Sequence, residues 1–228
     1  MDRLSTQRTI SSIKLFGGAL NKLILSLIFL FVVVQAIDAE EGLESQTDVL
    51  EELVIIEAGK ESDFQMFLGD KKNWRLSVDS QGTNSANNSV RLQWDEMEQA
   101  QTVSWRGRGE GQFYLASTPQ DLSSYDLANA ALVMVVRVNQ APKKQVVLRM
   151  GCGYPCAGNA DLTQLFKAVP LGQWLKVSID LACYSTRGLN TKEVDTPFLL
   201  LTAGKFSLSV SDIRLIPNTA KTATVRCS

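Results

Sequence analysis

Apolar and polar residues alternate through most of the chain after residue 70, and this period-two pattern limits the folds that the chain can adopt. Nine segments carry the alternation or a short apolar run rich in β-branched and aromatic residues: 74–78, 90–94, 102–105, 112–115, 131–138, 146–150, 174–181, 198–202 and 206–215. Successive side chains of a strand point to opposite faces of a sheet, so these segments are predicted to be strands. The strands do not alternate with long helices, which argues against a parallel α/β fold.

Helical spacing is clear in one segment. Residues 161–169 place four apolar side chains on one helical face, Asp161 stands where it can cap the first turn, and Pro170 ends the pattern. A weaker candidate, residues 49–56, fits either a helix or the first strand. The sequence therefore predicts an all-β fold, a jelly-roll β-sandwich with one short helix.

The last predicted strand changes phase along its length. Its apolar residues occupy even positions over 206–210, but Ile213 and Leu215 occupy odd positions. A shift of one residue moves side chains to the other face of a sheet, so a bulge or bend is expected near Ser211 and Asp212.

The N-terminal region has the pattern of a secretory signal. Residues 1–22 are basic, residues 23–34 are almost entirely apolar, and small residues at Ala36 and Ala39 offer cleavage positions. The apolar run is shorter than the roughly 20 residues that span a bilayer. We predict that residues 1–39 form a signal peptide or an uncleaved signal-anchor helix, residues 40–62 an acidic leader, and residues 63–228 the jelly-roll domain. The protein is expected to be exported to the periplasm or cell envelope, with membrane contact only through an uncleaved anchor.

Composition excludes several functions. The net charge is −1 and basic residues are interspersed with acidic ones, so nothing predicts binding to nucleic acid. The chain has no histidine, which excludes catalytic Ser/His/Asp and Cys/His systems. A pair of carboxylates can still support glycoside hydrolysis. However, the densest acidic cluster, Asp95, Glu96 and Glu98, follows a predicted strand and is interpreted as a solvated turn.

The four cysteines lie in the C-terminal part of the chain. An even number in an exported protein favours disulfides, and three complete pairings are possible. Cys152 and Cys156 flank a Gly-Tyr-Pro turn and are able to close a small loop, which would leave Cys183 to pair with Cys227. Zinc is disfavoured because histidine is absent and the spacing does not match a zinc site.

The best candidate for a binding site is the glycine-rich segment 105–114. Sugars present apolar C–H faces that an exposed aromatic ring covers, and hydroxyl groups that Arg, Glu and Gln can bind. The predicted carbohydrate-binding residues are Trp105, Arg106, Arg108, Glu110, Gln112 and Tyr114. The alternative is an ordinary hairpin in which Trp105 packs in the core and the charged residues face solvent.

Four other residues also allow a structural or a functional interpretation. Trp94 and Trp174 lie in alternating strands and are expected to point inward, whereas Tyr154 either packs on its turn or is exposed. Asp212 either caps backbone groups or contributes to a structural calcium site, and no other cofactor is expected.

Several motifs in order resemble a known family. They include GCGYPCAG at 151–158, LFKAVPLGQW at 165–174 and VDTPFLLLTAGKFSLSVSDIRLIP at 194–217. Together they resemble the C-terminal, galactose-binding-like domain of ExoP-type bacterial family 3 glycoside hydrolases, over roughly residues 67–217.

The resemblance implies a jelly roll that assists an enzyme without being catalytic. Catalytic residues of family 3 hydrolases belong to domains that precede this module, so no residue of this chain inherits a catalytic role. We expect a stand-alone, non-catalytic module that binds β-glucan or another polysaccharide. The alternative is an interaction module whose partner is an envelope protein, and a glycoside hydrolase is less favoured.

Overall fold

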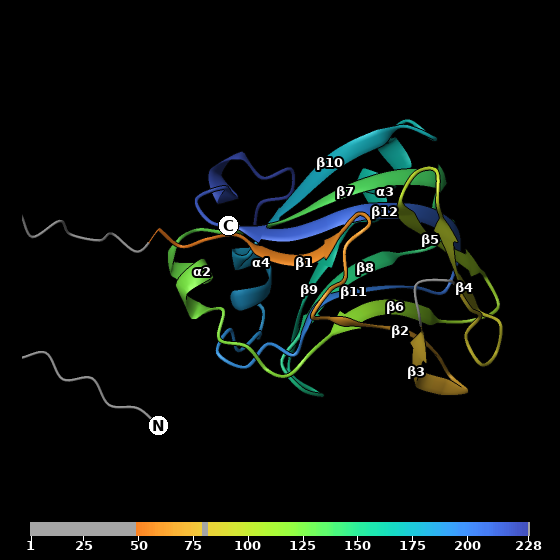
Figure 1. The fold of residues 1–228 in the computed structure, drawn as a ribbon, viewed down its shortest axis with the longest axis horizontal. Helices are drawn as coiled ribbons and strands as arrows, with labels where there is room; N and C mark the ends of the chain where they lie inside the picture. The colour runs from red at the N-terminus through yellow and green to blue at the C-terminus, as the bar shows by residue number, and fades with distance from the viewer. Residues whose placement is uncertain (1–48, 79–81, 228) are drawn as a thin grey trace, which may run out of the picture. The chain divides into compact units, whose positions relative to one another are not determined.

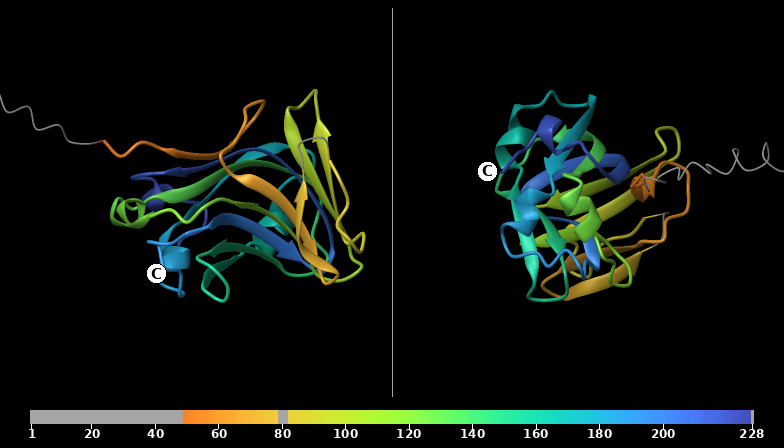
Figure 2. Two further views of the ribbon diagram at one scale, coloured as in Figure 1. Left: turned by 60° about the horizontal axis from the view of Figure 1, so that its bottom comes forward. Right: turned by 90° about the vertical axis from the view of Figure 1, so that its left-hand side faces the viewer.

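The computed structural model describes residues 49–78 and 82–227. Residues 1–39, for which a signal or anchor helix is predicted, lie outside the described residues. Two antiparallel six-stranded sheets face each other, as Figures 1 and 2 show. This arrangement confirms the predicted β-sandwich.

Sheet A has the strand order β10-β7-β12-β5-β4, and β1 also pairs with β12. Its strands are β1 (Leu53–Glu57), β4 (Val90–Asp95), β5 (Ala100–Arg106), β7 (Ala131–Gln140), β10 (Trp174–Asp180) and β12 (Lys205–Ile216). Sheet B has the order β3-β2-β6-β11-β8-β9. Its strands are β2 (Gln65–Asp70), β3 (Asn73–Val78), β6 (Gly111–Ala116), β8 (Val146–Gly151), β9 (Ala157–Asp161) and β11 (Thr196–Thr202). From β5 to β8 and from β9 to β12, consecutive strands belong to opposite sheets.

The long strand β12 organises sheet A and carries the predicted bulge. Its residues from Ser207 to Ile216 pair with β7. The register against β7 is irregular between Ser207 and Leu208, and the shift at the predicted place lies between Val210 and Asp212. On its other edge, residues before the shift pair with β5 and residues after it pair with β1. Phe206 and Leu208 before the shift, and Ile213 and Leu215 after it, are all buried. The phase change in the sequence thus marks the place where β12 changes partner and keeps its apolar face inward.

The folded unit begins before the expected boundary at residue 63. Residues 53–57, part of the segment interpreted as an acidic leader, form β1, which agrees with the alternative of a first strand for residues 49–56. The acidic side chains support this strand, because Glu52 and Glu57 both pair with Arg214 of β12.

The prediction of one helix is wrong. The described residues contain three short α-helices, α2 (Ser123–Leu127), α3 (Thr163–Ala168) and α4 (Ala182–Ser185), and a 3-10 turn η1 (Ala220–Thr222). The sequence predicts only α3. As expected, the Asp161 carboxylate accepts a hydrogen bond from the backbone N–H of Thr163, the first residue of α3. The other two are too short to show a periodic pattern. Among the described residues, no helix has the length and apolar character needed to cross a membrane.

One cluster of buried side chains fills the space between the sheets. The Trp105 ring from sheet A stacks on Phe206 at 5.5 Å between centroids, and Phe166 of α3 lies 5.5 Å from the same Phe206 ring. Aromatic stacking adds about 0.5–1.5 kcal/mol per pair to the burial of apolar area. The short helix therefore closes the core rather than forming a separate layer.

Both favoured disulfides are present. Cys152 bonds to Cys156, and Cys183 bonds to Cys227. The second bond holds the C-terminal segment on sheet A, where Val225 exchanges backbone hydrogen bonds with Ser178 and Asp180 of β10.

Candidate functional site

The outer face of sheet B carries a groove of about 380 Å³. Strands β3, β6, β8, β9 and β11 and the loop between β8 and β9 supply its lining, so residues far apart in the sequence meet there. The lining residues with polar or aromatic side chains are Arg75, Gln112, Arg149, Tyr154, Asn159, Asp195 and Thr196. We call this feature the sheet B groove.

A layer of aromatic and cationic groups lies on the same face beside the groove. Phe67 stacks on Tyr114 with ring centroids 4.9 Å apart, and the Arg75 guanidinium lies 4.6 Å above the Phe67 ring. A phenol is protonated at neutral pH, and burial raises the pKa of Tyr114 further above its ordinary value of 10; the hydroxyl donates to the Trp74 carbonyl at 3.2 Å. The cation–π contact holds the Arg75 side chain in place, and the residue is exposed to solvent.

Gln112 is positioned by a glycine opposite it. Gly69 on β2 pairs with Gln112 on β6, and a side chain at Gly69 would lie 2.6 Å from the Gln112 amide nitrogen. The absence of a side chain lets Gln112 fold over Gly69 and donate to the Trp74 carbonyl at 3.0 Å. The amide is therefore fixed at the edge of the groove.

An Arg–Asn pair forms the polar centre of the groove. Arg149 on β8 stands directly opposite Asn159 on β9, and Arg149 Nε donates to Asn159 Oδ1 at 2.8 Å. Directly opposed residues of antiparallel strands share one face of the sheet. The bond uses one edge of the guanidinium, and the planar fork of arginine binds paired oxygen atoms well. Asp195, which also lines the groove, adds a carboxylate acceptor.

Tyr154 provides an accessible aromatic ring at the groove. It lies in the loop closed by Cys152–Cys156, and its relative exposure is 101%. Backbone hydrogen bonds from Cys152 to Cys156 and from Cys156 to Gly153 fix the same loop. Tyr154 is therefore exposed and does not pack on its turn.

The structure does not bring the six predicted binding residues together. Trp105 is only 2% exposed and its indole N–H donates to the Gly111 carbonyl at 2.8 Å, so its expected role as an exposed stacking ring is wrong. The alternation of side chains along β5 directs Trp105 inward together with Val103. This agrees with the alternative of an ordinary hairpin in which Trp105 packs in the core. Only Gln112 lines the sheet B groove, and Tyr114 lies on the same face but is 6% exposed.

The charged residues of that segment lie elsewhere. Arg106 is on the opposite sheet and donates to Asn88 and Asn84 at 2.9 and 3.0 Å. Arg108 and Glu110 are exposed in the turn between β5 and β6.

Trp174, Trp94 and Asp212 lie outside the sheet B groove. Trp174 does not point inward: its ring lies under the Arg137 guanidinium at 4.9 Å and its indole N–H donates to Glu98 at 2.8 Å, on the outer face of sheet A. Trp94 does point inward, but it lies near the end of β4 and stays partly exposed. The Asp212 carboxylate is bound by the Arg214 guanidinium, and no group of three or more acidic or cysteine side chains among the described residues is arranged to hold a metal ion.

Comparison with known proteins identifies the family. The chain belongs to the Exop_C family, described as galactose-binding domain-like, whose model matches residues 62–215. The family resemblance expected from the sequence is therefore confirmed. No curated protein matches the chain.

Several solved structures share the fold of this chain. The extra C-terminal domain of an exo-1,3/1,4-β-glucanase from a Pseudoalteromonas species matches with a TM-score of 0.61 and 18% identity, covering 77% of this chain and 98% of that domain. In the complete glucanase the match has a TM-score of 0.60 and 17% identity, and covers 78% of this chain but 21% of the enzyme. A family 30 carbohydrate-binding module from a Clostridium thermocellum cellulase matches with a TM-score of 0.54 and 13% identity, over 74% of this chain and 98% of the module.

Proposed function

We propose that this protein is a non-catalytic carbohydrate-binding module that holds a neutral glucan chain in the sheet B groove. The observation that carries the proposal is that Tyr154, a fully exposed aromatic residue, lines the same groove as the Arg149–Asn159 pair. The jelly-roll topology and the names of the similar proteins support the same ligand class.

The chemistry of the groove suits a sugar chain. A pyranose ring has C–H groups that pack on an aromatic face and hydroxyl groups that need both donors and acceptors. Tyr154 supplies the face, the guanidinium groups of Arg149 and Arg75 and the amide N–H groups of Asn159 supply donors, and Asp195 supplies acceptors. Charges of both signs line the groove, so a neutral polyhydroxylated ligand fits better than a strongly charged one.

Affinity electrophoresis tests the proposal. The native protein is run through gels containing mixed-linkage 1,3/1,4-β-glucan, laminarin or hydroxyethyl cellulose, with Tyr154→Ala beside it. Trp74→Ala is the matched control, because Trp74 is also an exposed aromatic residue but does not line the groove. We expect at least one glucan to retard the native protein and Trp74→Ala equally, and to retard Tyr154→Ala much less. Retardation by none of them, or equal retardation of all three proteins, would reject the site.

The location of the protein rests on the N-terminal pattern alone. We propose export to the periplasm or cell envelope, where a polysaccharide ligand is accessible. Mass spectrometry of the protein from its native host should show removal of the segment before residue 40, or recovery of the full chain in the membrane fraction. A full-length protein in the cytosol would contradict export.

A further inference from the structure

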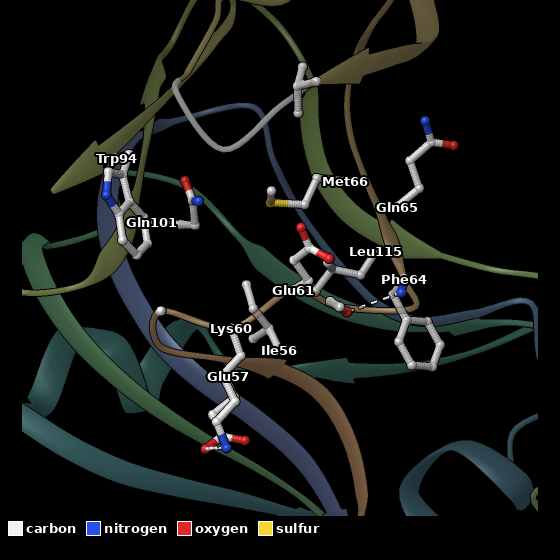
Figure 3. A pocket seen from close by; sticks show the side chains of 13 residues that line it. Ile56, Glu57, Lys60, Glu61, Phe64, Gln65, Met66, Trp94, Gln101 and Leu115 are labelled. Atoms are coloured by element: carbon white, nitrogen blue, oxygen red, sulfur yellow. Dashed lines mark hydrogen bonds and ion pairs between the residues drawn. The ribbon is translucent and has the colours of Figure 1, made fainter. Parts of the chain in front are cut away.

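A second cavity lies on the other side of sheet B, between the two sheets. It measures about 530 Å³, and the loop between β1 and β2 forms one wall of it. Figure 3 shows Trp94 and Gln101 of sheet A on one side, and Met66 and Leu115 of sheet B across from them. We call this feature the inter-sheet cavity; it shares no lining residue with the sheet B groove.

Gln101 is an unusual residue to find on this wall. It lies on β5 in phase with Val103 and Trp105, so it occupies a core-facing position, and it is 2% exposed. Its Oε1 atom is buried and has no hydrogen-bond partner. Buried side-chain oxygens are almost always paired, since the lost hydration is otherwise uncompensated. A leucine would fill the position without this cost, so the amide oxygen is better explained by a ligand that donates to it.

The charged groups around the cavity also favour a ligand that donates hydrogen bonds. Lys60 pairs with Glu57 at 2.8 Å, and Glu57 is also 3.4 Å from Arg214, so these charges are balanced. Glu61 is exposed and forms no ion pair with the described residues. Of the three charged lining residues, the one without an ion pair in the described part of the chain is therefore a carboxylate, and an anionic ligand would be repelled. The thioether of Met66 and the side chain of Leu115 give the same cavity an apolar surface.

We propose that the inter-sheet cavity binds a single neutral sugar unit, whose hydroxyl groups donate to Gln101 and Glu61 while its C–H groups contact Met66 and Leu115. This inference rests on the proposed function, because it assigns the same ligand class to a second site. The module would then have two sites with different geometry: an open groove that follows a chain, and a cavity large enough for one sugar unit.

The indole N–H resonance of Trp94, assigned by its loss in Trp94→Phe, reports on the cavity during titration of the full protein. The probes are D-glucose, D-galactose and N-acetyl-D-glucosamine, with D-glucuronate as the anionic comparison. We expect a saturable shift with at least one neutral sugar and at least tenfold weaker binding of glucuronate. Absence of a saturable shift with all three neutral sugars, which would mean a water-filled cavity, overturns the proposal, as does equal binding of glucuronate.

Two variants separate binding from folding. Gln101→Leu should weaken the neutral sugar at least tenfold while its urea midpoint stays equal or rises; undiminished binding would overturn the proposal. Glu61→Gln changes an exposed side chain, so it should fold normally and lose most of the discrimination against glucuronate; unchanged discrimination would count against the role of Glu61. Arg149→Ala, in the sheet B groove, should leave the Trp94 shift intact, so failure of the groove and failure of the cavity are distinguishable.

Discussion

Replacement of Cys183 and Cys227 by alanine removes the bond that holds the C-terminal segment on β10. The two cysteines are 44 residues apart in sequence. A cross-link over a loop of that length lowers the entropy of the unfolded chain by an amount worth roughly 4 kcal/mol at 25 °C. Cys183 is fully buried, so loss of its sulfur leaves a small cavity that adds about 1 kcal/mol. We therefore expect this double variant to lose about 4–5 kcal/mol of unfolding free energy.

The second disulfide provides the matched control. Cys152 and Cys156 are only 4 residues apart, for which the same relation gives roughly 2 kcal/mol. Both double variants are unfolded in urea without reductant and followed by tryptophan fluorescence. With a slope of about 2 kcal/mol per molar urea, the midpoints should fall by roughly 2 M for Cys183/Cys227 and roughly 1 M for Cys152/Cys156. Equal losses, or a larger loss for the short loop, would refute the loop-length reasoning.

Two more predictions concern buried positions. Burial alone would raise the pKa of Asp70, but hydrogen bonds from Ser85, Asn87, Lys72 and Asn73 outweigh it and lower the pKa below its ordinary value of 3.8. Stability from this carboxylate is therefore present above about pH 4 and lost as the pH falls through the folded-state pKa. Urea unfolding at pH 7 and pH 3 should show a smaller pH dependence in Asp70→Asn, and an unchanged dependence would exclude Asp70 as a cause. At Gly158 an added Cβ would lie 2.5 Å from the Tyr184 backbone, so Gly158→Ala should cost about 1–3 kcal/mol. At Gly151 the nearest contact is 3.3 Å, so Gly151→Ala should cost less in thermal unfolding, and the reverse order would contradict this packing.

The fold was predictable where the spacing of apolar residues shows which face of a strand or helix is buried. The change of phase near Ser211 located the bulge in β12, and the apolar face of residues 161–169 located α3. In contrast, β9 reads Ala-Gly-Asn-Ala-Asp and lacks the β-branched and aromatic residues typical of strands. It is a strand because β8 offers it an unpaired edge, which is a tertiary effect that local sequence does not show.

The candidate site was much less predictable. Its residues come from the loop between β8 and β9 and from five strands whose order in the sheet follows from long-range pairing, and the sequence period gives only the alternation of the strand residues. Arg149 had a usable signal, since it is the charged residue in an otherwise apolar strand and must face outward. Trp105 shows the opposite case: its alternation with Val103 indicated the core, and its attractive chemistry for sugar binding did not change its direction.

The central claim is that a glucan chain binds in the sheet B groove. Isothermal titration calorimetry of the native protein with an oligosaccharide of mixed 1,3/1,4-β-glucan tests it most directly, with Arg149→Ala and Arg108→Ala as the paired variants. A charged hydrogen bond is worth about 1.5–3 kcal/mol, so Arg149→Ala should weaken binding roughly 10- to 100-fold. Arg108, exposed in the turn between β5 and β6 and outside the groove, should have no effect when replaced. Absence of binding heat in the native protein, or loss of affinity in Arg108→Ala with Arg149→Ala unchanged, would contradict the claim.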